Sequence, residues 1–285
     1  MRAYLDCYPC FLRQALEAAR MATGDQDVHR RVLQRVSAFL GQLPPEATPI
    51  DAGLQIHRTV KEMAATPDPY REVKRECNDR ALSLYPDLRE LVEDAPDPLL
   101  MAVKLAAVGN TVDFGANPDF DLTRSLEEGV EQEFAGSGFR LFSDRLREVG
   151  RVLYIGDNTG EIVFDKILVE ELVTMGLEVT FVVREEPIIN DATLEDALYV
   201  GMDEVAEIVT SGVDSPGTLL HQCHPAFRDT FRRAEMILAK GQGNYEGLSG
   251  EEGPVFFLLK VKCPVIARDL GATVGDLVLR ASDPG

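Results

Sequence analysis

Apolar residues recur every three or four positions through the first half of the chain, up to about residue 146. This spacing is typical of amphipathic helices, and prolines separate one helical pattern from the next. Residues 1–146 are therefore predicted to form an all-helical bundle or cap. We expect its helices over residues 6–22, 25–43, 51–65, 69–85 and 98–108.

A different pattern begins near residue 147, where short β-branched runs alternate with helical ones. Such alternation is typical of βαβ units and a largely parallel sheet, so residues 147–285 are predicted to form a Rossmann-like α/β domain. The last two apolar runs almost touch, too close for a crossover helix, and at least one antiparallel strand is expected. The expected strands are residues 151–155, 178–183, 207–210, 236–239, 255–261 and 264–267.

Oxygen-bearing side chains follow the first two expected strands. Asp157 and Asn158 come directly after the strand at 151–155, and Asn190 and Asp191 lie in the segment beyond the second strand. The carboxyl ends of parallel strands share one edge of a sheet, where ligands collect. Carboxylate and amide oxygens bind hard divalent cations, so this edge is a candidate metal site.

Helix capping is the alternative role for these residues. Asn158 and Glu161 have the spacing of a capping box, and Asn190, Asp191 or Thr193 could start the helix expected at residues 194–200. For Asn158 and Glu161 alone the two interpretations are about equal. Two oxygen pairs at the same edge of one sheet favour a ligand role.

A glycine-rich segment follows the fourth expected strand and reads Lys240-Gly-Gln-Gly-Asn-Tyr-Glu-Gly247. Gly241 and Gly243 would let backbone N–H groups approach a phosphate, and Lys240 would add a positive charge. Asn244 and Glu246 stand among the glycines. The spacing matches neither a dinucleotide fingerprint nor a Walker loop, so a simple turn is the alternative.

Composition restricts the partners. The chain has 29 Lys and Arg against 48 Asp and Glu, a formal charge of -19, which disfavours nucleic acid and anionic membranes. No apolar run approaches the length of a membrane span, and no signal peptide is visible at the start, so a soluble cytoplasmic protein is expected. A small phosphorylated metabolite remains compatible, because a metal and one or two local cations can reverse the potential in a pocket.

The five cysteines do not suggest a disulfide framework in such a protein. Cys7 and Cys10 form a C-x-x-C pair, for which a second, structural metal and simple packing are about equally favoured. Asp113-Phe-Gly matches the kinase tripeptide by letters, but no other kinase segment accompanies it. Asn110 and Asp113 could instead reach the site from the helical half, although turn chemistry explains them about as well.

Several of these segments together resemble the damage-control phosphatase family, formerly a domain of unknown function. The resemblance rests on Gly-Asp-Asn-Thr-Gly-Glu161, Pro-Ile-Ile-Asn-Asp-Ala-Thr193 and Lys-Gly-Gln-Gly-Asn-Tyr-Glu246 in this order. The segments Cys7-x-x-Cys-Phe-Leu-Arg13 and Gly109-Asn-x-x-Asp-Phe-Gly115 resemble its prokaryotic branch.

The family resemblance implies a three-layer α/β/α sandwich with a helical N-terminal part. It also implies a divalent metal (Mg²⁺, Mn²⁺, Co²⁺ or Ni²⁺) held by Asp157, Asn158 and Asp191, and hydrolysis of phosphomonoesters such as sugar phosphates or damaged phospho-metabolites. A eukaryotic member has been described as a protein carboxyl methyltransferase.

We therefore expect a metal-dependent phosphatase. The expected catalytic residues are Asp157, Glu161 and Lys240; Glu161 or Glu246 would position the attacking water, and Asp157 as nucleophile is the alternative. No pattern selects one phosphomonoester or an oligomeric state. The expected substrate-binding residues are Lys240, Gly241, Gly243, Asn244, Glu246, Asn110, Asp113 and Asn190.

Two other functions compete with hydrolysis. The segment 152–161 also resembles the cofactor loop of S-adenosylmethionine methyltransferases, but Asn158 stands where those loops generally have glycine. The second strand is followed first by Arg184, where an acid would normally hold the ribose. A non-catalytic metal-binding or metabolite-binding protein is the third possibility.

Overall fold

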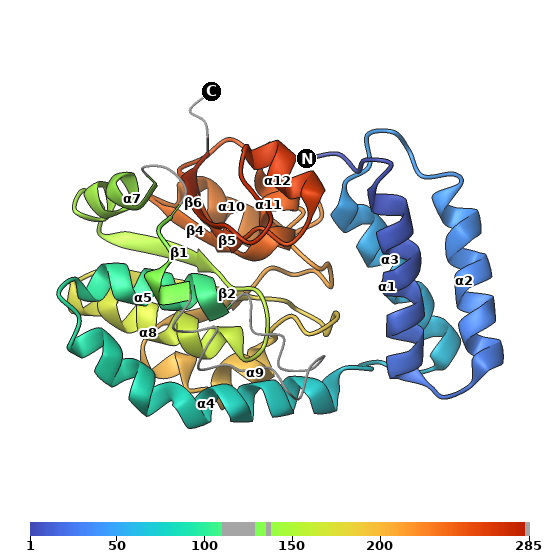
Figure 1. The fold of residues 1–285 in the computed structure, drawn as a ribbon, viewed down its shortest axis with the longest axis horizontal. Helices are drawn as coiled ribbons and strands as arrows, with labels where there is room; N and C mark the ends of the chain where they lie inside the picture. Colours follow the sequence, from blue (N-terminus) through green and yellow to red (C-terminus); the bar gives the residue numbers. More distant parts are fainter. Residues whose placement is uncertain (110–128, 135–137, 283–285) are drawn as a thin grey trace.

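A six-stranded sheet organises the second half of the chain in the computed structural model, which describes residues 1–109, 129–134 and 138–282 (Figure 1). The strand order is β3-β2-β1-β4-β5-β6; the first five strands are parallel, and β6 runs antiparallel to β5. The strands are β1 Arg151–Ile155, β2 Glu178–Val183, β3 Glu207–Thr210, β4 Ile237–Lys240, β5 Val255–Lys260 and β6 Leu277–Ala281.

The sheet is mixed, as predicted, but the antiparallel strand is a different one. The run at 264–267, predicted as a strand, lies in helix α12, Pro264–Leu270, with Pro264 in its first turn. A short apolar run does not distinguish a strand from the buried face of a helix, while proline at the first helical position favours the helix. The antiparallel partner of β5 is β6, which the sequence analysis missed.

Helices cover both faces of the sheet and make the predicted three-layer α/β/α sandwich. Successive β1 residues alternate between the layers: Val152 and Tyr154 belong to one hydrophobic cluster, and Leu153 and Ile155 to the other. The first cluster includes side chains of α4 Arg71–Glu93, α5 Pro98–Gly109, α7 Gly138–Leu146, α8 Glu161–Thr174, α9 Leu194–Tyr199 and the short 3₁₀ helix η1 Met202–Glu204. The second includes side chains of α10 Pro225–Arg233, α11 Gly241–Leu248 and α12.

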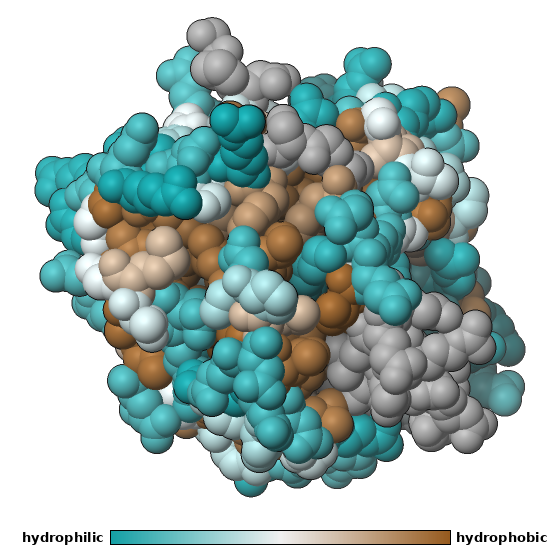
Figure 2. All heavy atoms as spheres, turned by 60° about the vertical axis from the view of Figure 1, so that its left-hand side comes forward, coloured by the Kyte–Doolittle hydropathy of each residue, from teal (hydrophilic) through white to brown (hydrophobic). Residues whose placement is uncertain are grey.

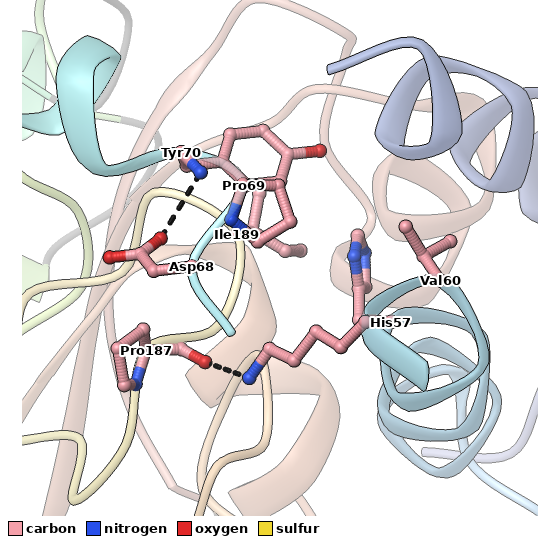
Figure 3. Close-up of a pocket in the computed structure, with 8 residues that line it drawn as sticks. His57, Val60, Asp68, Pro69, Tyr70, Pro187 and Ile189 are labelled. Carbon is pink, nitrogen blue, oxygen red and sulfur yellow. Dashed lines mark hydrogen bonds between the residues drawn. The ribbon is translucent and has the colours of Figure 1, made fainter. Parts of the chain in front are cut away.

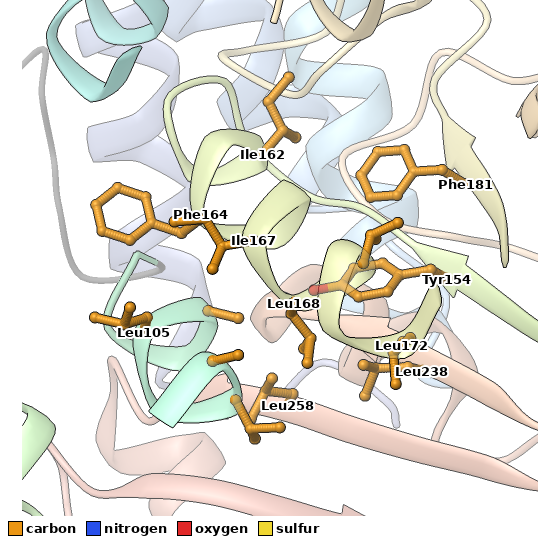
Figure 4. Packing of buried hydrophobic residues seen from close by; sticks show 14 of the residues in the cluster. Leu105, Tyr154, Ile162, Phe164, Ile167, Leu168, Leu172, Phe181, Leu238 and Leu258 are labelled. Atoms are coloured by element: carbon orange, nitrogen blue, oxygen red, sulfur yellow. The ribbon is translucent and has the colours of Figure 1, made fainter. Parts of the chain in front are cut away.

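Helix α8, which follows β1, is buried on nearly all sides. Its residues Phe164, Ile167 and Leu168 are fully buried between α5 and the strands (Figure 4). This enclosure fixes the position of the loop between β1 and α8.

The first three helices form a cluster of their own. Helices α1 Cys7–Ala22, α2 Gln26–Leu40 and α3 Pro49–Ala64 pack on one another at one end of the molecule (Figure 1). Helices α4, α5 and α7 instead share the core of the sheet. The division at residue 146 stays a prediction about domains, but the hydrophobic clusters separate α1–α3 from the remaining elements.

The other predicted helices exist with shifted ends. Helix α4 continues through Pro86 to Glu93, past the predicted end at residue 85. Beyond the proline, Leu88 and Val92 are buried in the core, so tertiary packing compensates for the lost backbone hydrogen bond.

The surface is not uniformly polar. Apolar surface shows between polar side chains on the face turned forward in Figure 2, and on α7 the side chain of Leu141 is exposed. Of the helices in the described ranges, none is long and apolar enough to cross a bilayer.

Candidate active site

The candidate site lies where the strand order reverses. In the sheet, β1 has β2 on one side and β4 on the other, and the helices that follow β1 and β4, α8 and α11, lie on opposite faces. Open α/β sheets bind ligands in the crevice at such a switch point. A cavity of about 520 Å³ opens here, and its lining includes Asp157, Asn158, Asn190, Asp191, Gly243 and Glu246.

The loops after β1 and β2 are joined directly at this cavity. The backbone N–H of Thr159 donates to the carbonyl of Asn190 at 2.9 Å, and that of Ala192 donates to the carbonyl of Asp157 at 2.8 Å. Asn158 and Asp191 form an isolated antiparallel bridge. The structure thus brings together the two oxygen pairs that the sequence placed in separate segments.

Helix capping does not explain these residues. Helix α8 has Gly160 at its N-cap and no side-chain cap, and the Nδ2 of Asn158 donates to Asp157 and Glu161 at 2.9 and 3.2 Å. Helix α9 is capped by Thr193, which forms the capping box with Asp196. Asn158, Asn190 and Asp191 are therefore available for another role.

Arg184, at the end of β2, is a site residue that the sequence analysis did not identify as such. Its guanidinium is buried, donates to Asp191 Oδ2 at 2.8 Å and lies 3.9 Å from Asp157 Oδ1. It also donates to Thr218 and to Asn244 Oδ1, at 3.1 and 3.2 Å. One cation therefore connects both candidate metal carboxylates to Asn244 of helix α11. The only signal in the sequence was an arginine at the end of an apolar strand.

Lys240 lies beneath the cavity. Its Nζ is fully buried and contacts Glu161 Oε1 at 2.5 Å and Asp165 Oδ1 at 2.9 Å, while Tyr154 donates to the same Asp165 oxygen. Burial alone lowers the pKa of Lys240, but Asp165 and Glu161 outweigh it and raise the pKa above its usual value. The predicted contact between this ammonium and a phosphoryl group does not agree with this placement. Asn244 is likewise buried, bound to Arg184 and Thr218.

Glycine is required at position 241 because the Asp157 carboxylate lies close to the backbone there. The φ of Gly241 is +82°, and a Cβ built on this residue would lie 1.8 Å from Asp157 Oδ2. No other residue type fits there without moving the carboxylate. At Gly243 a Cβ would lie 2.5 Å from the carbonyl oxygen of Pro216.

Helix α3 holds the loop that carries Asp191. The Nζ of Lys61 donates to the carbonyl of Pro187, four residues before Asp191 (Figure 3). Between them Ile189 has φ +47°, a strained conformation for a β-branched residue that the surroundings must enforce. His57 of the same helix lines the pocket beside this contact, with its ring centroid 6.4 Å from that of Tyr70, and burial lowers its pKa to about 4.

The comparisons with known proteins agree with this geometry. The chain matches the model of the ARMT1-like damage-control phosphatase domain over residues 3–278. The chain belongs to this family.

Relatives cover nearly the whole chain. A protein named damage-control phosphatase from Archaeoglobus fulgidus is 36% identical over 289 residues, which span 96% of this chain and 97% of the relative. Another of that name, from Pyrococcus horikoshii, is 34% identical, and the alignment spans 98% of this chain and 97% of the relative. A crystal structure of a DUF89 family protein from Pyrococcus horikoshii superposes with a TM-score of 0.90 at 30% identity, covering 99% of this chain and 100% of that one. These relatives support a phosphatase.

In this member of the damage-control phosphatase family, the buried carboxylates fit a divalent cation. Burial raises the pKa of Asp157 well above its usual value, and the charges of Glu161 and Asp191 raise it further, against Lys262 and Arg184. Burial also raises the pKa of Asp191. A cation would compensate the crowded negative charge, and two carboxylates with an amide oxygen are ligands that Mg²⁺ or Mn²⁺ accepts.

The cysteine pair borders the same cavity. Cys7, Cys10 and Cys263 contribute to its lining. Within the described ranges, no three His, Cys, Asp or Glu side chains are arranged to hold a metal ion, so a second metal at Cys7 and Cys10 stays a prediction. Asn110 and Asp113, expected to reach the site, lie outside the described residues.

Proposed function

We propose that this protein is a metal-dependent phosphatase that hydrolyses small phosphomonoesters, sugar phosphates or damaged phospho-metabolites. The observation that carries the proposal is the convergence of Asp157, Asn158 and Asp191 on one cavity. The names of the family's relatives, damage-control phosphatases, support the same reaction.

The oxygens of Asp157, Asn158 and Asp191 would hold the cation. A divalent ion, when bound, supplies a Lewis acid that polarises phosphoryl oxygens and lowers the pKa of a water. Arg184 fixes the Asp191 carboxylate through its Nε, and the missing side chain of Gly241 leaves room for the Asp157 carboxylate. Such fixed surroundings keep metal ligands in one orientation.

In the proposed reaction a water oxygen attacks phosphorus, the phosphorus–oxygen ester bond breaks, and the alcohol leaves with a proton. The Glu161 carboxylate is held by Lys240 Nζ and by Asn158 Nδ2. Glu161 is buried and lies outside the cavity lining, so we assign it the role of holding Asn158 in place. Of the two glutamates expected to position the water, Glu246 is the one that lines the cavity, and we assign this role to it. Lys262 lines the cavity, and we assign to it the positive charge near the phosphoryl group that the sequence analysis expected from Lys240.

The residues that follow β2, Arg184 and Glu185, disfavour the methyltransferase alternative. Arg184 is buried against Asp191, and the next residue, Glu185, is exposed and accepts a hydrogen bond from Thr210. An acid that holds a cofactor ribose is expected to face the crevice at this strand end.

The test is turnover of a generic aryl phosphate by chelator-treated protein, with Mg²⁺, Mn²⁺, Co²⁺ or Ni²⁺ added back. We expect hydrolysis only with metal, and a loss of at least about a hundredfold in Asp157→Asn, since even residues that merely support a metal ligand affect activity by about 10–100-fold. The control is Asp229→Asn, on the exposed part of α10. Metal-independent turnover, or full activity in Asp157→Asn, would refute the proposal.

A further inference from the structure

The cavity has a second wall, formed by helix α1. Cys7, Cys10 and Gln14 recur at three- and four-residue spacing and line the cavity together with Arg13. Residues at this spacing share one face of a helix. The neighbouring face of α1, with Ala15 and Ala19, packs into the α1–α3 cluster. This helix therefore presents a polar face to the candidate active site.

Two cations lie in the cavity lining, and they occupy different walls. Lys262 follows β5 and acts electrostatically on Asp157, whereas Arg13 comes from α1. Arg13 contacts Cys10 Sγ at 3.5 Å. In the described part of the chain, neither cation has a carboxylate within salt-bridge distance, although the protein carries a formal charge of -19.

Two acids of the cavity lining, Asp6 and Glu246, have other partners than these cations. Asp6, at the rim, pairs with Arg268 at 3.3 Å. Glu246 accepts from Gln242 at 2.9 Å, and burial raises its pKa to about 7. The cationic groups of Arg13 and Lys262 are therefore available to a ligand that brings its own negative charges.

Part of the cavity lining is apolar. Ile50, Pro216 and Val265 all contribute to the cavity. A lining that combines metal-binding oxygens, apolar side chains and a cation from another wall matches a phosphorylated ligand that carries a second anionic group on a small organic body. A guanidinium recognises carboxylate or phosphate oxygens with two parallel hydrogen bonds.

We propose that the substrate is a phosphomonoester with a second anionic group, and that Arg13 binds this second group and determines specificity. The inference rests on the proposed phosphatase activity. Arg13 acts on substrate binding and not on bond cleavage, so its removal should raise KM and leave kcat nearly unchanged.

The experiment compares two matched pairs of substrates. Glycerol 3-phosphate and 3-phosphoglycerate differ by a carboxylate, and fructose 6-phosphate and fructose 1,6-bisphosphate differ by a second phosphate. We expect wild-type protein to prefer at least one of the doubly anionic members by about tenfold or more in kcat/KM, the effect of one charge-assisted hydrogen bond. The pair that shows the preference identifies the second group.

Arg13→Gln should abolish this preference through KM and leave the singly anionic members and a generic aryl phosphate unaffected. Arg13→Lys should recover part of it. The matched control is Arg20→Gln, in the last turn of the same helix and outside the cavity lining. Equal kcat/KM within both pairs, or a preference that survives in Arg13→Gln, would overturn the inference.

Failure of the proposed function is distinguishable from failure of this inference. The aryl phosphate reports on hydrolysis alone, because it carries no second anion. If it is not hydrolysed, calorimetric binding of 3-phosphoglycerate and fructose 1,6-bisphosphate to metal-loaded wild-type and Arg13→Gln protein still decides the role of Arg13. Weaker binding in the variant supports it, and equal binding excludes it.

Discussion

At the scale of single residues, the candidate site depends on the absence of a Cβ at Gly241. The backbone of Gly241 lies so close to the Asp157 carboxylate that a methyl group there would overlap Oδ2. The same glycine begins α11 directly after β4. The position of Asp157 is therefore determined by a residue that has no functional group of its own.

Gly241→Ala is expected to displace Asp157 and to strain the backbone at φ +82°. We expect metal affinity to fall by at least about tenfold and the free energy of unfolding to fall by about 1–3 kcal/mol. Calorimetric metal binding and chemical denaturation measure the two effects. The control, Gly250→Ala, places its Cβ in open space. If Gly241→Ala binds metal as well as the control does, the proposed position of the cation is wrong.

The sequence was informative about the residues that face the cavity and less so about those beneath it. Asp157, Asn158 and Asp191 stood out because oxygen-rich pairs after strands are recognisable locally. Arg184 and Asp165 did not, since their roles come from contacts with Asp191 and Lys240 that only the folded sheet creates. Lys240 was noticed for its position at the end of β4, but its partners, Glu161 and Asp165, lie on helix α8.

At the scale of elements, helix α3 holds two loops of the site at once. Lys61 binds the loop before Asp191, and Arg58 forms two hydrogen bonds with Asp214 in the loop after β3. Gly53 of α3 packs against Pro216: a Cβ built on Gly53 would lie only 3.0 Å from the Cγ of Pro216. The α1–α3 cluster thus supports the geometry of the sheet's loops as well as one wall of the cavity.

Lys61→Met should loosen the loop that carries Asp191, because the hydrogen bond to Pro187 is lost. We expect the metal concentration for half-maximal activity to rise by about tenfold, the size of effect that supporting residues have on metal sites. Metal titrations of activity measure this change. Arg35→Met is the control, since Arg35 is exposed and its contact with Glu62, at 4.0 Å, is exposed as well. An unaltered metal requirement in Lys61→Met would show that α3 does not position the loop.

Elements were predicted well where the hydrophobic pattern was long or clear. Five strands lie where the alternation of patterns placed them; four of them are largely buried between helices, and β3 is a half-exposed edge strand. Helix α12 was mistaken for a strand, since Val265-Ile-Ala is too short to show a period, and β6 was missed at the edge of the sheet. No local pattern indicates that α1 lines the cavity, because that depends on how the α1–α3 cluster packs.

At the scale of the whole molecule, burial in the cavity couples stability to pH. Glu246 lies in the cavity lining, and burial raises its pKa from 4.5 to about 7. The folded protein therefore binds this proton more tightly than the unfolded chain does. The resulting stabilisation is complete below pH 4.5 and is lost as the pH rises through about 7.

Glu246→Gln should remove this dependence, because the amide does not titrate. We expect the free energy of unfolding to decline less steeply between about pH 4.5 and 7 in the variant than in the wild type. Chemical denaturation at several pH values within this range measures the slopes. The exposed Glu252→Gln serves as control and should retain the slope of the wild type. Identical slopes in all three proteins would contradict the assignment.

The pairing of β1 with β4 has a consequence for the nascent chain during its synthesis. Leu153 lies beside Ile237 in the sheet, although they are far apart in the chain, and a ribosome releases the earlier part first. Asp157 and Asp191 leave the ribosome well before Gly241 and Asn244, whose contacts complete their surroundings. A nascent chain therefore completes its candidate active site only when its synthesis is almost finished. A fragment that stops before β4 should lack the proposed phosphatase activity.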